Sequence, residues 1–181
     1  MESKQPIALT RETDVITIPN GTLGKLPAGA HVRIMQRLGG SFTVSDARGG
    51  LYRITSADAD ALGLTPAASP DAAAQDAPFS EKRVWDELKT VFDPEIPVNI
   101  VDLGLVYDMK ISPLPSGQSA VSVKMTLTAP GCGMGGVIAG DAQQRLLGLP
   151  GVEEANVEIV WEPGWHHSMI TPEGRRILGL D

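Results

Sequence analysis

The chain has 181 residues, of which 42% are hydrophobic and 20% are charged, and this composition is typical of a folded globular protein rather than a disordered or fibrous one. Its 22 acidic residues exceed its 15 basic ones, and the net charge of -7 argues against nucleic acid or an anionic membrane as the main partner, because both need a basic surface. Residues 1–10 lack the apolar core of a secretion signal, and prolines and glycines break the longest uncharged stretch, residues 125–140. We therefore expect a cytoplasmic protein that binds neither nucleic acid nor a membrane.

The clearest boundary along the chain lies at residues 65–78, which are rich in alanine and proline. Such a segment contains few side chains that a core could bury, so it predicts a flexible linker. We expect two domains, at residues 1–64 and 79–181. The acidic character belongs to the linker and the second domain, because acidic residues outnumber basic ones in residues 79–181.

The first domain is predicted to be all-β. Short apolar segments are separated by glycine-containing turns, and they lie at residues 15–18, 32–38, 42–44 and 51–54. This pattern favours a small β-barrel. Thr55 or Ser56 is a candidate cap for a short helix that runs through Ala61 and is closed by Gly63. We expect His31, beside a glycine turn, to be exposed rather than functional.

The second domain begins with a predicted helix. Ser80 can cap it, and its apolar residues follow helical spacing at Val84, Trp85, Leu88, Val91 and Phe92. The helix is expected to end at Asp93-Pro94, because proline excludes its predecessor from a helix. The loop DPEIPVNIVDLG then leads to the first strand of this domain.

Strands and helices alternate through the rest of the chain. A strand around residues 105–111 and a second at 121–127, with strict alternation of apolar and polar side chains, form a predicted hairpin. A helix follows the glycine-rich segment TAPGCGMGG and ends at residues 149–151, a third strand spans 155–161, and a capped terminal helix lies within 171–179. The order helix, hairpin, helix, strand, helix predicts a compact two-layer α/β sandwich on a small sheet.

Cys132, the one cysteine of the chain, is the first candidate for chemistry. It lies between Gly131 and Gly133, after a predicted strand and immediately before a helix. Unpaired backbone N–H groups at a helix start favour a thiolate, which is the form that attacks electrophiles or binds metal ions. The alternative is a small buried residue in a tight turn. One cysteine excludes an intrachain disulfide and a metal site built wholly from this chain's thiolates.

The glycines around Cys132 also match the dinucleotide-binding pattern G-x-G-x-x-G between a strand and a helix. A Rossmann domain needs several further βα units, and too few residues follow Glu162 to form them. No Gly-Lys-Ser/Thr follows the glycines, which excludes a nucleotide-hydrolysing P-loop. The pattern therefore does not predict a nucleotide site.

Three carboxylates, Asp93, Glu95 and Asp102, lie in the proline-stiffened loop before the hairpin. Asp93 could simply end the helix and Asp102 could brace a turn, whereas Glu95 has no obvious local role. His166 and His167 lie in a loop before the terminal helix. Adjacent histidines point apart in an extended chain, so at most one of them is a candidate metal ligand.

The segments DPEIPVNIVDLGLVYD, TAPGC, GVEEANVEIVWEP and GRRILGLD follow one another in the second domain, which resembles the metal-sulfur cluster biosynthesis (MIP18-like) family over residues 80–181. The resemblance implies a compact α/β domain that assists the assembly of iron-sulfur clusters or their delivery to client proteins. Cys132 matches the family's motif cysteine and is the implied functional residue. The residues that match the family's first motif are Asp93, Pro94, Glu95, Asp102 and Gly104.

We therefore expect an iron-sulfur cluster maturation factor that acts as a carrier. The candidate ligands of iron or of a transient cluster are Cys132, Glu95, Asp102 and His166. A cubane cluster is usually held by four thiolates, so one cysteine per chain predicts a cluster shared in a homodimer, a partner that supplies ligands, or ligands of the carboxylate and imidazole type. The expected partners are iron-sulfur scaffold or carrier proteins and apo client proteins.

Two other functions fit the same residues. A thiol-dependent enzyme would use Cys132 as its nucleophile and His166 or His167 as its base. A client-binding scaffold would use the acidic face of the second domain. Beyond one activated cysteine the sequence contains no catalytic constellation, so we expect a protein that is not an enzyme.

Overall fold

The computed structural model describes residues 5–38, 40–65, 78–131 and 133–180. The chain divides into two compact units, unit 1 (Met1–Ala73) and unit 2 (Ala74–Asp181). The predicted mixed α/β class is confirmed, because the chain contains a six-stranded sheet, a three-stranded sheet and helices. Most of the predicted linker, residues 66–77, lies outside the described residues.

Unit 1 is built on an antiparallel sheet with the strand order β1-β4-β5-β6-β2-β3. Its strands are β1 (Ile7–Ala8), β2 (Thr13–Ile18), β3 (Thr22–Leu26), β4 (His31–Leu38), β5 (Ser41–Asp46) and β6 (Leu51–Thr55). A 3-10 helix, η1 (Ser56–Leu62), follows β6 and is closed by Gly63 at a φ of 68°. Strands β1 and β3 are the edges, and no ladder joins them in the described part of the chain, so closure into a barrel stays a prediction.

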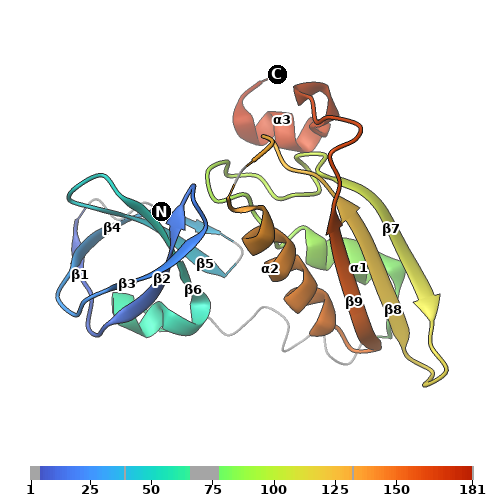
Figure 1. Ribbon diagram of the computed structural model, residues 1–181, viewed down its shortest axis with the longest axis horizontal. Coiled ribbons are helices and arrows are strands. Elements are labelled where there is room, and N and C mark those ends of the chain that lie inside the picture. Colours follow the sequence, from blue (N-terminus) through green and yellow to red (C-terminus); the bar gives the residue numbers. More distant parts are fainter. Residues whose placement is uncertain (1–4, 39, 66–77, 132, 181) are drawn as a thin grey trace. The chain divides into compact units, whose positions relative to one another are not determined.

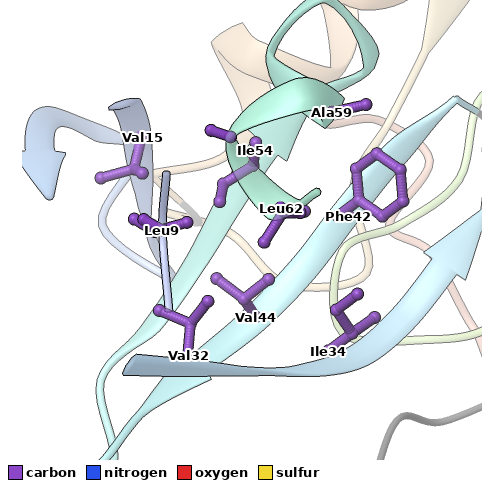
Figure 2. Packing of buried hydrophobic residues seen from close by; sticks show 10 residues of the cluster. Leu9, Val15, Val32, Ile34, Phe42, Val44, Ile54, Ala59 and Leu62 are labelled. Atoms are coloured by element: carbon purple, nitrogen blue, oxygen red, sulfur yellow. The ribbon is translucent and has the colours of Figure 1, made fainter. Parts of the chain in front are cut away.

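The core of unit 1 is mainly aliphatic and comes from strand positions that point to one side and from η1. Figure 2 shows Leu62 of η1 directed towards Val44 and Ile54 of the sheet. The labelled members of this cluster are Leu9, Val15, Val32, Ile34, Phe42, Val44, Ile54, Ala59 and Leu62. The short helix therefore belongs to the core.

Two strands of unit 1 have no counterpart in the sequence analysis. Strand β1 has only two residues, too few to show a period. Strand β3 contains Gly24 and Lys25 and exposes 79% of Leu23, so no apolar alternation marks it. It is defined instead by its pairing with β2, which is a tertiary contact. His31 is exposed at the start of β4, as predicted.

Unit 2 follows the predicted order of elements (Figure 1). They are α1 (Glu81–Leu88), β7 (Val106–Pro113), β8 (Ser119–Met125), α2 (Gly135–Leu147), β9 (Val152–Ile159), a short 3-10 helix η3 (His167–Met169) and α3 (Pro172–Leu178). Strand β8 is central, antiparallel to β7 and parallel to β9. Helix α2 makes the crossover that a parallel pair requires.

One face of the sheet in unit 2 is buried. Along β8, Val121 and Val123 are 1% exposed, whereas the alternate residues Ser122 and Lys124 are exposed. Their partners on β9 repeat the pattern, because Val157 pairs with Val123 and the exposed Glu158 pairs with Lys124. The strict alternation in the sequence therefore marks one covered and one open face. Within the described residues, no helix combines the length and apolar composition of a membrane span.

The first helix of unit 2 ends earlier than predicted. Ser80 caps it as expected, accepting a hydrogen bond from Arg83 N, but α1 stops at Leu88 and not at Asp93. The chain leaves the helix because Val91 O accepts a hydrogen bond from Ile100 N at 2.9 Å, and because Phe92 forms a β-bridge with Asn99. These partners lie in the next loop, so the helical spacing at Val91 and Phe92 does not reveal them.

We expect unit 2 to fold without unit 1. A fragment of residues 79–181 should give a cooperative thermal transition, because this length supports a core of its own. Trp85, Trp161 and Trp165 are all the tryptophans of the chain and all lie in unit 2, so their fluorescence follows this unit in the full chain as well. The two midpoints should agree within about 4 °C, which corresponds to less than about 1 kcal/mol. An insoluble fragment, or one without a cooperative transition, would refute independent folding.

Candidate functional site

Three connections meet at one end of the sheet in unit 2. Strand β7 begins where β8 and β9 end, because β7 is antiparallel and β9 is parallel to β8. The acidic loop (residues 93–105), the β8–α2 connection (residues 126–134) and the terminal segment (residues 160–180) therefore share this end (Figure 1). Backbone hydrogen bonds of 2.8 Å join Thr126 N to Leu105 O and Val160 N to Met125 O. The three connections are thus adjacent where they leave the sheet.

Each connection carries predicted site residues. Glu95 and Asp102 lie in the acidic loop, and His166 lies in the terminal segment. Cys132 belongs to the β8–α2 connection and lies outside the described residues. The topology therefore brings the segments that carry these residues to one end of unit 2, although they are far apart in sequence.

The start of α2 is packed tightly onto the ends of the strands. Met134 is fully buried. A Cβ added to Gly135 would lie 2.5 Å from Leu127 Cδ1 and 3.2 Å from Ile159 Cδ1, so it would require these two side chains to shift. Glycine at this position therefore lets α2 begin close to Leu127 and Ile159.

The same helix start has no acidic residue in its first turn, and no described side chain caps it. The leading N–H groups of a helix carry a partial positive charge, which favours an anion nearby. In the sequence, Cys132 stands just before this turn.

Asp93 organises the tip of the acidic loop. Its Oδ1 accepts hydrogen bonds from Glu95 N at 2.8 Å and Ile96 N at 3.0 Å, and the residue is 7% exposed. Burial raises the pKa of Asp93, and the two backbone donors, which favour the carboxylate, offset part of that rise. Asp93 therefore does not end α1; it holds a turn that presents the exposed side chain of Glu95.

Asp102 is 8% exposed and uses both of its carboxylate oxygens within the protein. Oδ2 accepts a hydrogen bond from Asn99 Nδ2 at 2.6 Å, and Asp102 N donates to Asn99 Oδ1 at 2.8 Å. Oδ1 accepts from the Thr171 hydroxyl at 3.0 Å. The side chain thus connects the acidic loop with the residue that begins α3.

The predicted histidines lie on the surface of the terminal segment. His166 and His167 are both exposed, and the His167 ring lies 4.9 Å from the Trp165 ring. Trp165 in turn donates from Nε1 to Leu103 O at 2.8 Å. Among the described residues, no three His, Cys, Asp or Glu side chains are close enough to hold a metal ion. Cys132 is not among the described residues, so a metal site that includes it stays a prediction.

Comparison with known proteins assigns the family. A model described as "Iron-sulfur cluster assembly protein" matches residues 81–159. A Porphyromonas gingivalis "Fe-S protein maturation auxiliary factor" is 36% identical over 101 residues, which are 56% of this chain and 92% of that protein. The chain belongs to the iron-sulfur cluster assembly protein family. The "Fe-S protein maturation auxiliary factor SufT" of Staphylococcus aureus is 36% identical over 90 residues, or 50% of this chain and 98% of SufT.

A crystal structure of the "Domain of Unknown Function DUF59" from Bacillus anthracis is also similar, at 34% identity and a TM-score of 0.48, covering 56% of this chain and 92% of that chain. The family match confirms the resemblance inferred from the sequence motifs. The iron-sulfur cluster assembly model lies within unit 2 and ends at residue 159. It includes the acidic loop and the β8–α2 connection, and the terminal segment lies beyond it.

Sequence reasoning missed the partners that tie the terminal segment to the acidic loop. Thr171 was recognisable as a helix cap, because Pro172 follows it, but its bond to Asp102 spans 69 residues. Asn99 is a local partner, because it lies three residues before Asp102 and accepts a hydrogen bond from Asp102 N. Tyr107 carried no local signal, and only the fold brings it to Pro163 and brings Thr171 to Asp102.

Proposed function

We propose that this protein is a maturation factor that takes up iron or an iron-sulfur cluster and helps to deliver it to client proteins. Membership of the iron-sulfur cluster assembly protein family supports this function, and so do the names of its relatives. The observation that carries it is the convergence of the three connections with candidate ligands at one end of unit 2. Iron or the cluster is the cargo, so the protein is a carrier and not an enzyme.

In this proposal Cys132 binds the cargo as a thiolate. The start of α2, which no described side chain caps, supports that assignment, because a helix N-terminus stabilises the anionic form of a thiol. Glu95 and His166 are the further candidate ligands, since both side chains are exposed. Asp102 is a weaker candidate, because it is only 8% exposed and each of its oxygens already accepts a hydrogen bond.

A single thiolate per chain is too few to hold a cubane cluster. A cubane cluster is usually bound by four thiolates, and this chain has one cysteine. We propose that the remaining ligands come from a second copy of the chain in a homodimer, from a scaffold or carrier protein, or from an apo client during transfer. Such ligands suit a transient complex in the cytoplasm.

We further propose a division of labour between the units. Unit 2, as a two-layer sandwich over residues 79–181, carries the cargo. Residues 65–78 form a flexible linker between unit 2 and a small β-barrel-like domain. The alanine- and proline-rich composition of these residues supports the linker. The fragment described above tests the boundary.

The experiment that tests the function uses the full chain with ferrous iron and sulfide under anaerobic conditions. We expect visible absorption, bound iron and sulfide that co-elute with the protein, and recovery of activity when an apo iron-sulfur enzyme is added. Because the chain has one cysteine, alkylation of that thiol before reconstitution gives a uniquely modified control that should do none of these. A protein that binds no iron and activates no apo enzyme is not a carrier. Rapid stoichiometric alkylation of the thiol without metal, together with failure to bind iron, would favour the thiol enzyme instead.

A further inference from the structure

The terminal segment is attached to the rest of unit 2 by specific hydrogen bonds in addition to packing, since Ile170 within it is 4% exposed. The Tyr107 hydroxyl donates to Pro163 O at 2.7 Å, and Trp165 Nε1 donates to Leu103 O at 2.8 Å. Pro163 is exposed and Trp165 is half-buried, so neither residue is enclosed in the core. The partners are 56 and 62 residues apart in sequence. The segment therefore returns over the acidic loop as a strap.

The strap ends at a hydroxyl that serves two elements at once. Thr171 Oγ1 donates to Asp102 Oδ1 at 3.0 Å and accepts from Gly174 N at 3.1 Å, so it caps α3 and binds the acidic loop. The backbone adds a further bond, from Thr171 N to Asp102 O at 2.9 Å. A hydroxyl has only one proton to donate. Thr171 donates that proton to Asp102, so its oxygen is left to accept the hydrogen bond from Gly174 N.

Asp102 connects Thr171 with Asn99, which lies at the base of the loop that presents Glu95. Its carboxylate fixes the amide of Asn99, which is only 7% exposed. The backbone of Asn99 forms the β-bridge with Phe92, and this bridge closes the loop between the two residues. The exposed Glu95 lies within that closed loop. A continuous set of bonds therefore runs from the cap of α3 to the turn that carries Glu95.

We propose that the terminal segment positions the acidic loop for cargo binding, and that Asp102 and Thr171 are positioning residues rather than iron ligands. This inference rests on the proposed function and assigns a role to residues beyond the matched family model, which ends at residue 159. Asp102 is 8% exposed, so iron could reach both of its oxygens only if the hydrogen bonds from Asn99 and Thr171 were displaced. A buried polar group without a partner is destabilising.

The test uses Thr171→Val in the full chain, because this change leaves Asp102 intact and removes only the hydroxyl. We expect hydrogen exchange at Glu95 N and Ile96 N to become about fivefold faster, which is the effect of losing one hydrogen bond of about 1 kcal/mol. Thr171→Ser keeps the hydroxyl and is the matched control, so exchange at these two amides should stay at the parent rate. Both amides report on the acidic loop, because each donates to Asp93 Oδ1.

The exchange pattern separates positioning from simple anchoring of α3. Loss of the cap by itself accelerates exchange in α3, for example at Gly174 N. If Thr171→Val affects α3 and leaves Glu95 N and Ile96 N unchanged, the loop is not positioned by the strap. Trp165→Phe provides a second variant if Thr171→Val does not fold, because it removes one donor of the strap and leaves the cap of α3 in place. It should also accelerate exchange at the two loop amides.

Ferrous iron is the probe that tests whether the position of the acidic loop affects cargo binding. Thr171→Val should release bound iron about fivefold faster than the parent and Thr171→Ser, in proportion to the loosening of the loop. Equal release rates with a loosened loop would show that loop position does not serve cargo binding and would overturn the inference. If the parent itself binds no iron, the proposed function fails, and the exchange measurement still decides whether the strap positions the loop.

Discussion

Replacing Cys132 by serine should remove iron binding while the fold remains. Serine is nearly isosteric with cysteine and tolerates a glycine-rich connection, but its hydroxyl is far less acidic than a thiol and is a poor metal ligand near neutral pH. Iron affinity should fall by at least about tenfold, since even the loss of residues that merely support a ligand costs about 10- to 100-fold. The thermal midpoint should change by less than about 4 °C. Iron counting after anaerobic reconstitution and tryptophan fluorescence measure the two quantities.

A relocated thiol is the matched control for this variant. Ser112 is exposed in β7, so adding Ser112→Cys to Cys132→Ser restores one thiol per chain at a different place. The double variant should not recover iron binding, because the thiol no longer precedes α2. In cells that depend on this protein, Cys132→Ser should lower the activity of iron-sulfur enzymes while their apo-protein levels hold. Should the serine variant bind iron and support those enzymes as the parent does, an adaptor role built on the acidic surface replaces the carrier mechanism.

Gly104→Ala should strongly destabilise unit 2. Gly104 has a φ of 71°, a conformation that is unfavourable for alanine by about 1 to 2 kcal/mol. An added Cβ would also overlap the backbone oxygen of Met169 and lie 2.7 Å from its carbonyl carbon. Because the obstacle is backbone, relief requires the terminal segment to move, and overpacking of this kind costs about 1 to 3 kcal/mol more. We expect a total loss of about 2 to 5 kcal/mol in the free energy of unfolding.

Gly117→Ala separates the two contributions. Gly117 has a similar φ of 85°, but a Cβ there would meet nothing within 4 Å. Gly117→Ala is therefore destabilised only by the unfavourable backbone conformation of the new alanine. Urea unfolding of the full chain, followed by tryptophan fluorescence, should place Gly104→Ala about 1 to 3 kcal/mol below Gly117→Ala. Equal stabilities would mean that Met169 does not pack on Gly104 in solution.

Local signals in the sequence were sufficient for most elements of unit 2. Alternation along β8 predicted its covered face, and the glycine-rich segment predicted the start of α2 within a few residues. The terminal helix was marked at both ends, by Thr171 as its cap and by Gly179, whose φ of 67° closes it. These features depend on residues within one turn or one strand of each other, so a short window of sequence contains all the information.

The end of α1 is an example in which the local sequence pattern predicted the wrong boundary. Val91 and Phe92 keep the helical period, yet both lie outside the helix, because the returning acidic loop supplies hydrogen-bond partners for their backbone. Strand β3 fails for the opposite reason, since it lacks a period and exists through its pairing with β2. In both cases a contact between separate elements outweighs a weak local preference.

The candidate site divides in the same way. Motifs and periods are properties of contiguous residues, so they predicted the family and the order of elements in unit 2, which are confirmed, and the candidate ligands, which stay predictions. The bond between Thr171 and Asp102, and the position of the terminal segment over the acidic loop, follow from the folded unit and from no local pattern. The antiparallel β7 and the parallel β9 bring three distant connections to one end of the sheet. Such contacts form between residues separated by more than fifty positions, where no local preference acts and only the closure of the whole unit determines which groups meet.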